Sequence, residues 1–385
     1  MKKVPKHITK TLLQLEENDA LLALECPDGR IDFMSNDYLG VVKHQLGEET
    51  LPTGHRISHG ATGSRLLAGN SMIHLEFEAW LADYYNGESA LVFNSGFVAN
   101  YGIVDALATR HDVILYDEWI HASLRDGCRI SNAASYSFKH NDLEDLADKI
   151  AKHRNKADNI YVLVESLYSM DGDIPDIEAI CKICDLDNVY LIVDEAHSTG
   201  IMGDNGEGLV IEKGLEDKVF LRIYTFGKAI GRKGAVAVGD KIVIDFLINR
   251  CRSFIYSTAL SPLDILRIKS AINAVKGMRQ ERSYLQDLSD YANGLFSKIP
   301  GIKYIPNDSP IKPLIIGNGS FIHQTVSNLR LNSINARVIT SPTVPVGTER
   351  VRVVLHSFNT KDEVQLLYQI LCGQSVENDL LNIAK

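Results

Sequence analysis

Short runs of β-branched and other apolar residues recur along the first two thirds of the chain, and amphipathic stretches of helical period separate them. The clearest apolar runs cover residues 90–93, 113–116, 160–164, 189–193, 219–224 and 235–238. The helical patterns LEDLADKIAKH and IEAICKIC lie between such runs. Buried strands that alternate with helices are typical of a mostly parallel sheet. The pattern therefore predicts a large α/β domain over residues 46–262.

The pattern changes after Pro262. A long helical segment, LDILRIKSAINAVKGMRQERSYLQDLSDYANGLFSKI, leads to shorter apolar strands in PLIIG and RVRVVL, with helical patterns between them. We expect residues 263–385 to form a linker helix and a small α+β C-terminal domain. Residues 1–45 are expected to form an N-terminal helix and a short hairpin.

Charge and hydropathy narrow the classes of partner. The 385 residues carry 40 Lys and Arg against 49 Asp and Glu, a net charge of −9, with no basic block. Nucleic-acid binding normally leaves a basic footprint, so no nucleic-acid partner is expected. No stretch approaches the ~18 apolar residues of a membrane span. No signal peptide is seen at the N-terminus, and we expect a cytoplasmic protein.

The six cysteines are spread thinly, which is typical of reduced thiols in the cytosol. Cys181 and Cys184 form a C-x-x-C, but they lie in a helical pattern and no second such pair exists. We interpret them as core residues one helical turn apart. His55 and His59 lack the H-E-x-x-H pattern and have glycines beside them, so no metal site is expected.

Candidate chemistry follows the strand ends, where open α/β sheets bind their ligands. Gly96 stands in a strand-to-helix turn that could hold an anion, although a plain turn is an equal interpretation. His121 follows the next strand and is, taken alone, as compatible with a structural role. Asp194 and His197 form a D-E-A-H, and no phosphate loop accompanies it, which excludes the helicase interpretation. Lys228 stands in a Gly-flanked turn and, by itself, is also compatible with an exposed position.

Together these residue types match the requirements of pyridoxal phosphate. A lysine can form a Schiff base, and an acid can keep a pyridine nitrogen protonated. A histidine can lie on the ring, and a glycine turn can hold the phosphate. The combination predicts a pyridoxal 5′-phosphate site at the carboxyl ends of the strands.

The chain resembles the α-oxoamine synthases, which are pyridoxal-phosphate enzymes of fold type I, the aspartate aminotransferase-like group. The resemblance runs from about Asp32 to Glu363. The motifs that carry it include SNDYLG (35–40), HGATGSRLLAGN (59–70), FNSGFVAN (93–100), DEWIHASLRDG (117–127), ESLYSMDGD (165–173), DEAHSTGIMGDNGEG (194–208), TFGKAIGRKGA (225–235) and SPTVPVGTERVRV (341–353). So many motifs in one order make the resemblance specific.

The resemblance implies roles for particular residues. Lys228, His121, Asp194 and His197 would be catalytic. The cofactor would be bound by Lys228, Ser95, Gly96, Phe97, His121, Ser169, Asp194, His197, Thr225 and Thr258. Within this set, Lys228 would hold the cofactor and later move the substrate α-proton, Asp194 would pair with the ring nitrogen, and His121 would stack on the ring.

The resemblance also implies substrates and a partner. Arg352 would bind the amino-acid carboxylate with help from Asn36, because a planar guanidinium suits a carboxylate. Thr258 would reach the phosphate of a neighbouring subunit, so a homodimer with shared active sites is expected. The implied reaction is a decarboxylative condensation of an amino acid with an acyl thioester of CoA or of a carrier protein.

Details favour the branch of the family that condenses L-alanine with a pimeloyl thioester for biotin synthesis. They are TFGKA with the following G-x-x-GA, FIYSTALSP and PLIIG. Serine with a palmitoyl thioester, or glycine with a shorter one, stays an alternative. The biotin-pathway members often carry arginines in the N-terminal segment, whereas residues 15–30 here are acidic. That departure leaves the acyl chain and its carrier open.

Overall fold

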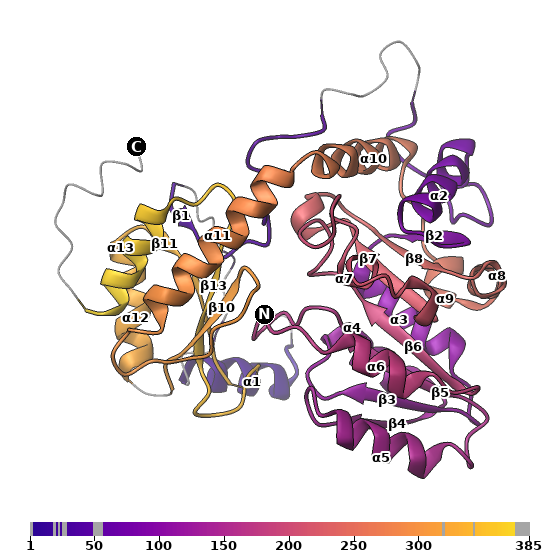
Figure 1. Ribbon diagram of the computed structural model, residues 1–385, viewed down its shortest axis with the longest axis horizontal. Helices are drawn as coiled ribbons and strands as arrows, with labels where there is room; N and C mark the ends of the chain where they lie inside the picture. The colour runs from indigo at the N-terminus through magenta and orange to yellow at the C-terminus, as the bar shows by residue number, and fades with distance from the viewer. Residues whose placement is uncertain are drawn as a thin grey trace.

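A seven-stranded sheet forms the centre of the larger part of the molecule (Figure 1). The computed structural model describes residues 3–17, 21, 24, 29–48, 57–317, 320–341 and 343–373. The strands are β2 (Ser89–Phe93), β3 (Val113–Asp117), β4 (Ala134–Phe138), β5 (Ile160–Glu165), β6 (Val189–Asp194), β7 (Leu221–Thr225) and β8 (Ala235–Gly239). Their order is β2-β8-β7-β6-β5-β3-β4, and only the pairs that include β8 are antiparallel. The mostly parallel sheet expected from the sequence is confirmed.

Each of the six apolar runs lies within or across one of these strands, and β4 is the strand that the sequence analysis missed. In β4 only Phe138 is buried, because the strand lies at the edge of the sheet. An edge strand with a solvated face carries no continuous apolar run.

Helices cover both faces of this sheet, and alternate residues of each strand meet opposite layers. Leu91 and Phe93 of β2 pack with one layer, whereas Ala90 and Val92 pack with the other. The first layer holds α3 (Gly96–Leu107), α4 (Ala122–Ile130), α8 (Lys241–Arg250) and α9 (Arg252–Ile255). The second layer holds α2 (Met72–Tyr84), α5 (Leu143–His153), α6 (Ile177–Cys184), α7 (Leu209–Glu212) and α10 (Pro262–Lys276). Cys181 and Cys184 are buried in the second layer, as the helical interpretation predicts.

A four-stranded antiparallel sheet forms the smaller part. Its order is β12 (Arg337–Ile339), β13 (Arg350–Val354), β10 (Ile311–Ile315) and β9 (Lys303–Tyr304). The helices of this part are α11 (Arg279–Phe296), α12 (Ser320–Leu331) and α13 (Lys361–Leu371). The long helical segment after Pro262 is divided at Gly277–Met278: α10 packs against α2, and α11 packs against α13. This break lies where the chain passes from one part to the other (Figure 1).

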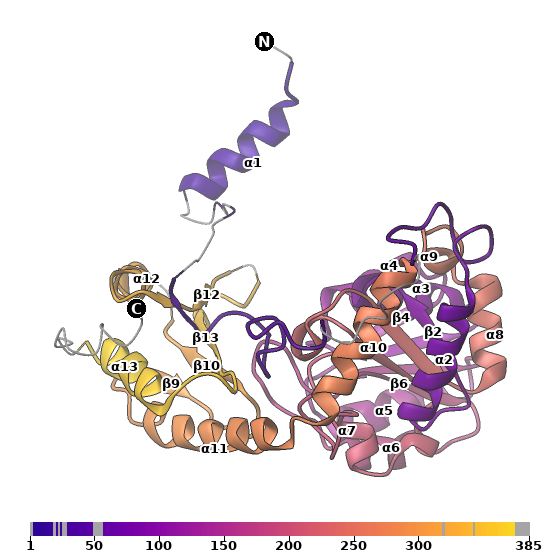
Figure 2. The ribbon, with the colours of Figure 1, turned by 90° about the horizontal axis from the view of Figure 1, so that it is seen from above.

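The N-terminal segment begins with α1 (Lys6–Glu17), which has no buried residue and projects from the rest of the molecule (Figure 2). Part of the segment in which a hairpin is expected before residue 45 lies outside the described residues. Strand β1 (Ile31–Asp32) pairs in parallel with β11 (Ile334–Asn335), which ties this segment to the smaller part. Most of the acidic stretch after α1, together with His55 and Cys26, lies outside the described residues. Within the described ranges, no helix has both the length and the apolarity needed to cross a bilayer.

Candidate active site

Polar side chains end three neighbouring parallel strands of the large sheet. Glu165, Asp194 and Thr225 are the last residues of β5, β6 and β7, and all three are buried. Because these strands are parallel, their carboxyl ends meet at one edge of the sheet. The side chains therefore converge on the place where the sequence analysis expected the ligand.

Lys228 lies three residues after β7, at the start of the short 3-10 helix η2 (Lys228–Ile230). Its φ of 48° is in the left-handed region, which costs free energy for a residue with a side chain. Burial lowers the pKa of its amine to about 8, although the negative charge of Asp194 opposes that shift. A lysine with this pKa is partly neutral near pH 7, so it can act as a nucleophile or as a base.

A chain of hydrogen bonds joins Asp194 to His121. Asn100 of α3 donates from Nδ2 to Asp194 Oδ2 at 2.6 Å and to Ser123 Oγ at 3.0 Å. Ser123 Oγ lies 2.7 Å from His121 Nδ1. The backbone N–H of His121 donates to Glu165 at the end of β5. Burial lowers the pKa of His121, so its ring is held neutral and in a fixed orientation.

Burial also controls the charge state of two further groups at this sheet edge. The carboxyl of Glu165 is buried beside Asp194, and both its burial and the charge of Asp194 raise its pKa well above the ordinary value. His197 is buried, and its pKa is lowered well below the ordinary value by burial and by the charges of Lys228 and Arg352. One acid and one histidine are therefore held uncharged beside Asp194.

A second cluster lies between this edge and the smaller part. Arg352 of β13 is buried; its Nε donates to the Ser169 carbonyl at 2.7 Å, and a terminal nitrogen donates to Asn36 Oδ1 at 3.1 Å. The Tyr38 hydroxyl lies 2.6 Å from His197 Nδ1 and donates to Asn36 Oδ1 at 3.4 Å. Tyr38 thus connects the arginine cluster with the strand-end cluster.

A hollow with a volume of about 560 Å³ opens beside Lys228 and Asn36. Asn36 and Lys228 lie on its wall with Ser35, Gly227 and Phe358. Residues predicted from two different parts of the chain therefore face the same space. Within the described ranges, no group of three or more His, Cys, Asp or Glu side chains is placed to hold a metal ion.

The turn after β2 forms a close backbone cradle beside β7. Ser95 caps α3, its side chain accepting from the N–H of Val98 at 3.3 Å, so the first N–H groups of the helix lie at this turn. A Cβ on Gly96 would meet the Thr225 methyl group at 2.4 Å, which only a glycine avoids. The Thr225 hydroxyl is buried and has no hydrogen-bond partner among the described residues. A buried, unpaired hydroxyl beside a helix N-terminus suits an anionic group such as a phosphate.

Two predicted residues lie at the margin of the site. The Phe97 side chain is exposed and stands edge-on to His121, with ring centroids 6.4 Å apart. Thr258 is exposed as well, and its carbonyl accepts from Asn94, the residue before the cradle, at 2.6 Å. Their proximity to the cradle follows from these contacts, whereas the expected contact of Thr258 with a neighbouring subunit stays a prediction.

Three residues of the site were not predicted. Glu165 carries the same signal as Asp194, an acid at the end of a buried strand, and that signal could have found it. Asn100 and Tyr38 carry none, because each acts through a partner distant in sequence.

Comparison with known proteins agrees with this geometry. The family model for aminotransferase class I and II matches residues 28–370. A relative from Microcystis aeruginosa, named "Putative 8-amino-7-oxononanoate synthase", is 34% identical over 90% of this chain and 88% of its own.

Solved structures extend the comparison to the fold. An 8-amino-7-oxononanoate synthase from Francisella tularensis is 28% identical with a TM-score of 0.75, over 90% of this chain and 98% of that one. A serine palmitoyltransferase solved with pyridoxal phosphate has a TM-score of 0.84 at 24% identity, over 96% of each chain. The resemblance to the α-oxoamine synthases and the fold type I architecture are confirmed, and this fold is that of pyridoxal-phosphate enzymes.

Proposed function

The chain belongs to the aminotransferase class I and II family, within which it is an α-oxoamine synthase, and we propose that it condenses L-alanine with a pimeloyl thioester. The observation that carries the proposal is the place of Lys228, a lysine of lowered pKa at the strand ends beside Asp194. The relative named for 8-amino-7-oxononanoate synthesis supports the choice of substrates.

The residues present fit pyridoxal phosphate. The unpaired Thr225 hydroxyl, the N–H groups of Gly96 and Phe97, and the Ser95 side chain would hold its phosphate. Asp194 would pair with the ring nitrogen, His121 would lie on the ring face, and His197 and Ser169 would hydrogen-bond at its edge. When bound, the cofactor supplies an electron sink that stabilises negative charge at the substrate α-carbon.

Lys228 would hold the cofactor through its Nζ and then act on the substrate. With a pKa of about 8, about a tenth of the amine is neutral at pH 7 and about half at pH 8, so Nζ can attack a carbonyl carbon and can also accept the α-proton. Asp194 favours proton transfer to Lys228, because its negative charge stabilises the positive charge that Nζ gains. It would also stabilise a protonated ring nitrogen of the cofactor. Asn100 keeps the carboxylate in place with a 2.6 Å hydrogen bond.

Arg352 and Asn36 would orient the amino acid. The guanidinium is buried and held through its Nε by the Ser169 carbonyl, so its remaining N–H groups keep a fixed direction. Asn36, which Arg352 contacts, lines the same hollow as Lys228, so a carboxylate bound there would lie on the side of the hollow that faces Lys228. Such fixed placement of the reacting atom is a large part of catalysis.

The overall reaction balances without an oxidant or reductant. The α-carbon of alanine loses its proton and attacks the thioester carbonyl; a carbon–carbon bond forms, the carbon–sulfur bond breaks and a free thiol leaves. The former alanine carboxylate then leaves as CO₂, and a proton returns to the same carbon. The product is 8-amino-7-oxononanoate. A homodimer in which Thr258 of one subunit reaches the phosphate of the other belongs to the same proposal.

The experiment crosses alanine, serine and glycine against pimeloyl, palmitoyl and acetyl thioesters, on CoA and on a carrier protein. Release of free thiol and the mass of the amino-ketone product are measured. We expect the largest kcat/KM for alanine with a pimeloyl thioester. A preference for serine with a palmitoyl thioester would overturn the substrate assignment and retain the α-oxoamine synthase class.

A further inference from the structure

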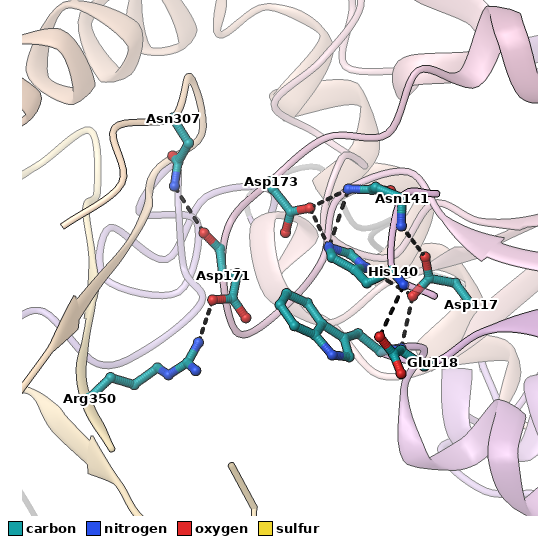
Figure 3. Close-up of polar contacts among 9 residues, drawn as sticks. Asp117, Glu118, His140, Asn141, Asp171, Asp173, Asn307 and Arg350 are labelled. Atoms are coloured by element: carbon teal, nitrogen blue, oxygen red, sulfur yellow. Dashed lines mark hydrogen bonds and ion pairs between the residues drawn. The ribbon is translucent and has the colours of Figure 1, made fainter. Parts of the chain in front are cut away.

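A second polar cluster lies beside the site, around the ring of His140 (Figure 3). His140 follows β4, and its two ring nitrogens contact different carboxylates: Nδ1 lies 2.9 Å from Asp117 Oδ1, and Nε2 lies 2.7 Å from Asp173 Oδ2. The ring stacks on Trp119 with centroids 3.8 Å apart and lies nearly perpendicular to the ring of Tyr168, with centroids 4.5 Å apart. Both nitrogens and one face of the imidazole are therefore engaged.

The ring of His140 is held in its charged form. Burial alone would lower its pKa, but the hydrogen bonds and negative charges of Asp117 and Asp173 outweigh burial and raise it to about 9. Glu118 adds a third acid nearby, and its Oε1 accepts from the His140 backbone N–H at 3.1 Å. His140 is thus a fixed cation among three acids, and the proton it carries keeps Asp117 and Asp173 from facing each other as bare anions.

Asp173 ends a tight turn, residues 168–173, that follows β5. The N–H of Tyr168 donates to the Asp173 carbonyl at 3.0 Å, and the N–H of Gly172 donates to the Tyr168 carbonyl at 2.9 Å. Asn141 also binds this end of the turn, because its Nδ2 donates to Asp173 Oδ2 at 2.6 Å. The segment after β4 of the large sheet therefore fixes the 168–173 turn through the side chain of Asp173.

The other side of the same turn contacts the smaller part. Asp171 forms an ion pair with Arg350 of β13, and its carbonyl accepts from Asn307 Nδ2 at 2.9 Å (Figure 3). Gly172 approaches β10 so closely that a Cβ there would lie 2.2 Å from the Ile311 carbonyl oxygen. The Ser169 carbonyl accepts from Arg352. Arg350 and Arg352 are two residues apart on one strand, so both hold the turn from the same face of β13.

We propose that His140 is a positioning residue, which fixes the 168–173 turn and, through the turn, the direction of Arg352. The inference rests on the proposed function only where it assigns the substrate carboxylate to Arg352. Its physical basis is a continuous path of charged contacts: the imidazolium holds Asp173 at one end of the turn, and the carbonyl of Ser169 at the other end holds the guanidinium. Charge-assisted hydrogen bonds are the strong ones, so this path is stiff.

Loss of the imidazolium leaves two carboxylates that repel each other across the vacated space. We expect the Asp173 end of the turn to move away from Asp117 and the guanidinium to lose its fixed direction. Amino-acid binding then weakens, whereas the strand-end residues around Lys228 keep their places, because the pairing of β5, β6 and β7 holds them. A displacement of about 1 Å is enough to weaken a positioned contact substantially.

The test uses the full-length holoenzyme and the variant His140→Gln. We expect the KM of the amino acid, and its Kd measured from the change in visible absorbance on binding, to rise about tenfold. kcat and the KM of the thioester should stay within about twofold. The double variant His140→Gln/Asp173→Asn removes the repulsion as well, so part of the lost affinity should return. A general loss of folding would not be rescued in this way.

His153→Gln is the matched control. His153 also stacks on an aromatic ring, that of Tyr136 at 4.7 Å, but burial and nearby lysines lower its pKa, and no carboxylate of the described residues pairs with it. If His140→Gln lowers the yield of folded protein, Asp173→Asn alone carries the same test, because its side chain is 30% exposed. A histidine-labelled NMR titration of the wild-type protein supplies a readout independent of turnover, with one ring expected to titrate at about 9.

Three results separate the two proposals. Wild-type protein without cofactor on Lys228 and without turnover overturns the proposed function. Active wild-type protein with an unchanged amino-acid KM and Kd in His140→Gln overturns the positioning role alone. The positioning role is also overturned if His140→Gln lowers kcat and the kcat/KM of both substrates by equal factors, and if the added Asp173→Asn change restores none of them.

Discussion

The two halves of the site are built in different ways. The half around Lys228 draws on the ends of adjacent strands in one sheet, which are fixed to each other by backbone hydrogen bonds. The half around Arg352 joins three segments distant in sequence: Asn36, the Ser169 carbonyl and β13 of the smaller sheet. The first half depends on one rigid element, and the second depends on how two sheets are held together.

This difference predicts a division of labour. Groups that move protons need sub-ångström placement, which a continuous sheet provides. A group that binds a carboxylate tolerates more adjustment, and its contacts can close after the substrate arrives. Changes in the first half should therefore abolish turnover, whereas changes in the second half should mainly alter the amino-acid KM.

Replacement of Lys228 by alanine should have the largest effect. The variant loses both the covalent hold on the cofactor and the base for the α-proton, so turnover should fall by about 10⁴-fold or more. Borohydride reduction followed by mass spectrometry should find the cofactor on Lys228 in the wild type and on no residue of the variant. Lys233→Ala, an exposed lysine in the same loop, is the control and should keep full activity. Turnover retained by Lys228→Ala would contradict the assignment of the first half.

The lowered pKa of Lys228 gives a second test on the protein freed of cofactor. Its pKa is about 8, so the amine is protonated well below pH 8 and becomes a neutral nucleophile as the pH rises through 8. An exposed lysine has a pKa near 10.4 and is almost fully protonated at pH 7.5. Lys228 should therefore react with an acylating reagent at pH 7.5 about 10²-fold faster than an exposed lysine does. Competitive labelling read by mass spectrometry measures this ratio, with Lys233 as the reference.

Asp194→Asn sharpens the labelling test. The negative charge of Asp194 raises the pKa of Lys228 against burial, so its removal should lower that pKa and move the labelling curve to lower pH. An unchanged curve would show that the carboxylate and the amine do not share one electrostatic environment.

Replacement of Arg352 by alanine tests the second half. Loss of a charge-assisted pair with the substrate carboxylate should raise the amino-acid KM by about 10- to 100-fold and leave the cofactor on Lys228. Arg352→Lys keeps the positive charge but loses the planar pair of donors. Its amino-acid KM should therefore lie between those of the wild type and Arg352→Ala. An unchanged KM in both variants would place the carboxylate elsewhere.

The same division explains what the sequence could predict. The strands of the large sheet are short apolar runs, so their pattern is visible, and the residues that follow them mark the site edge. Asp194 and Lys228 were found in this way. Strand β4 was missed because only Phe138 in it is buried. Contacts within one sheet follow from strand order, and that is why the first half was the more predictable one.

The second half could not be derived from local pattern. Arg352 lies in an apolar strand of the smaller part, and only its family motif pointed to a role. Tyr38 and Asn36 meet it because β1, just before them in the chain, pairs with β11 of the smaller part. Contacts across more than 300 residues depend on the packing of two sheets, which no periodicity in the sequence records.

The smallest expected effect concerns Tyr38, where the two halves meet. Its buried hydroxyl lies 2.6 Å from His197 Nδ1 and donates to Asn36 Oδ1 at 3.4 Å. Tyr38→Phe removes one good hydrogen bond, worth about 1 kcal/mol or roughly fivefold in an equilibrium constant. Because the hydroxyl touches both halves, we expect cofactor affinity and the amino-acid KM to weaken together, each by less than about fivefold.

Tyr85→Phe is the matched control for this change. Tyr85 is equally buried, but its hydroxyl has no hydrogen-bond partner in the part of the chain that the structure describes, so its removal should leave both constants unchanged. Cofactor affinity is measured by fluorescence titration of the cofactor-free protein, and the KM by thiol release. If Tyr38→Phe alters the KM alone, the hydroxyl serves only the carboxylate half, and the two halves are joined through the 168–173 turn and not through Tyr38. If the cofactor Kd and the amino-acid KM both rise, the hydrogen bond between Tyr38 and His197 is a second link between the two sheets. A hydroxyl that contacted only one half of the site would alter only one of these constants.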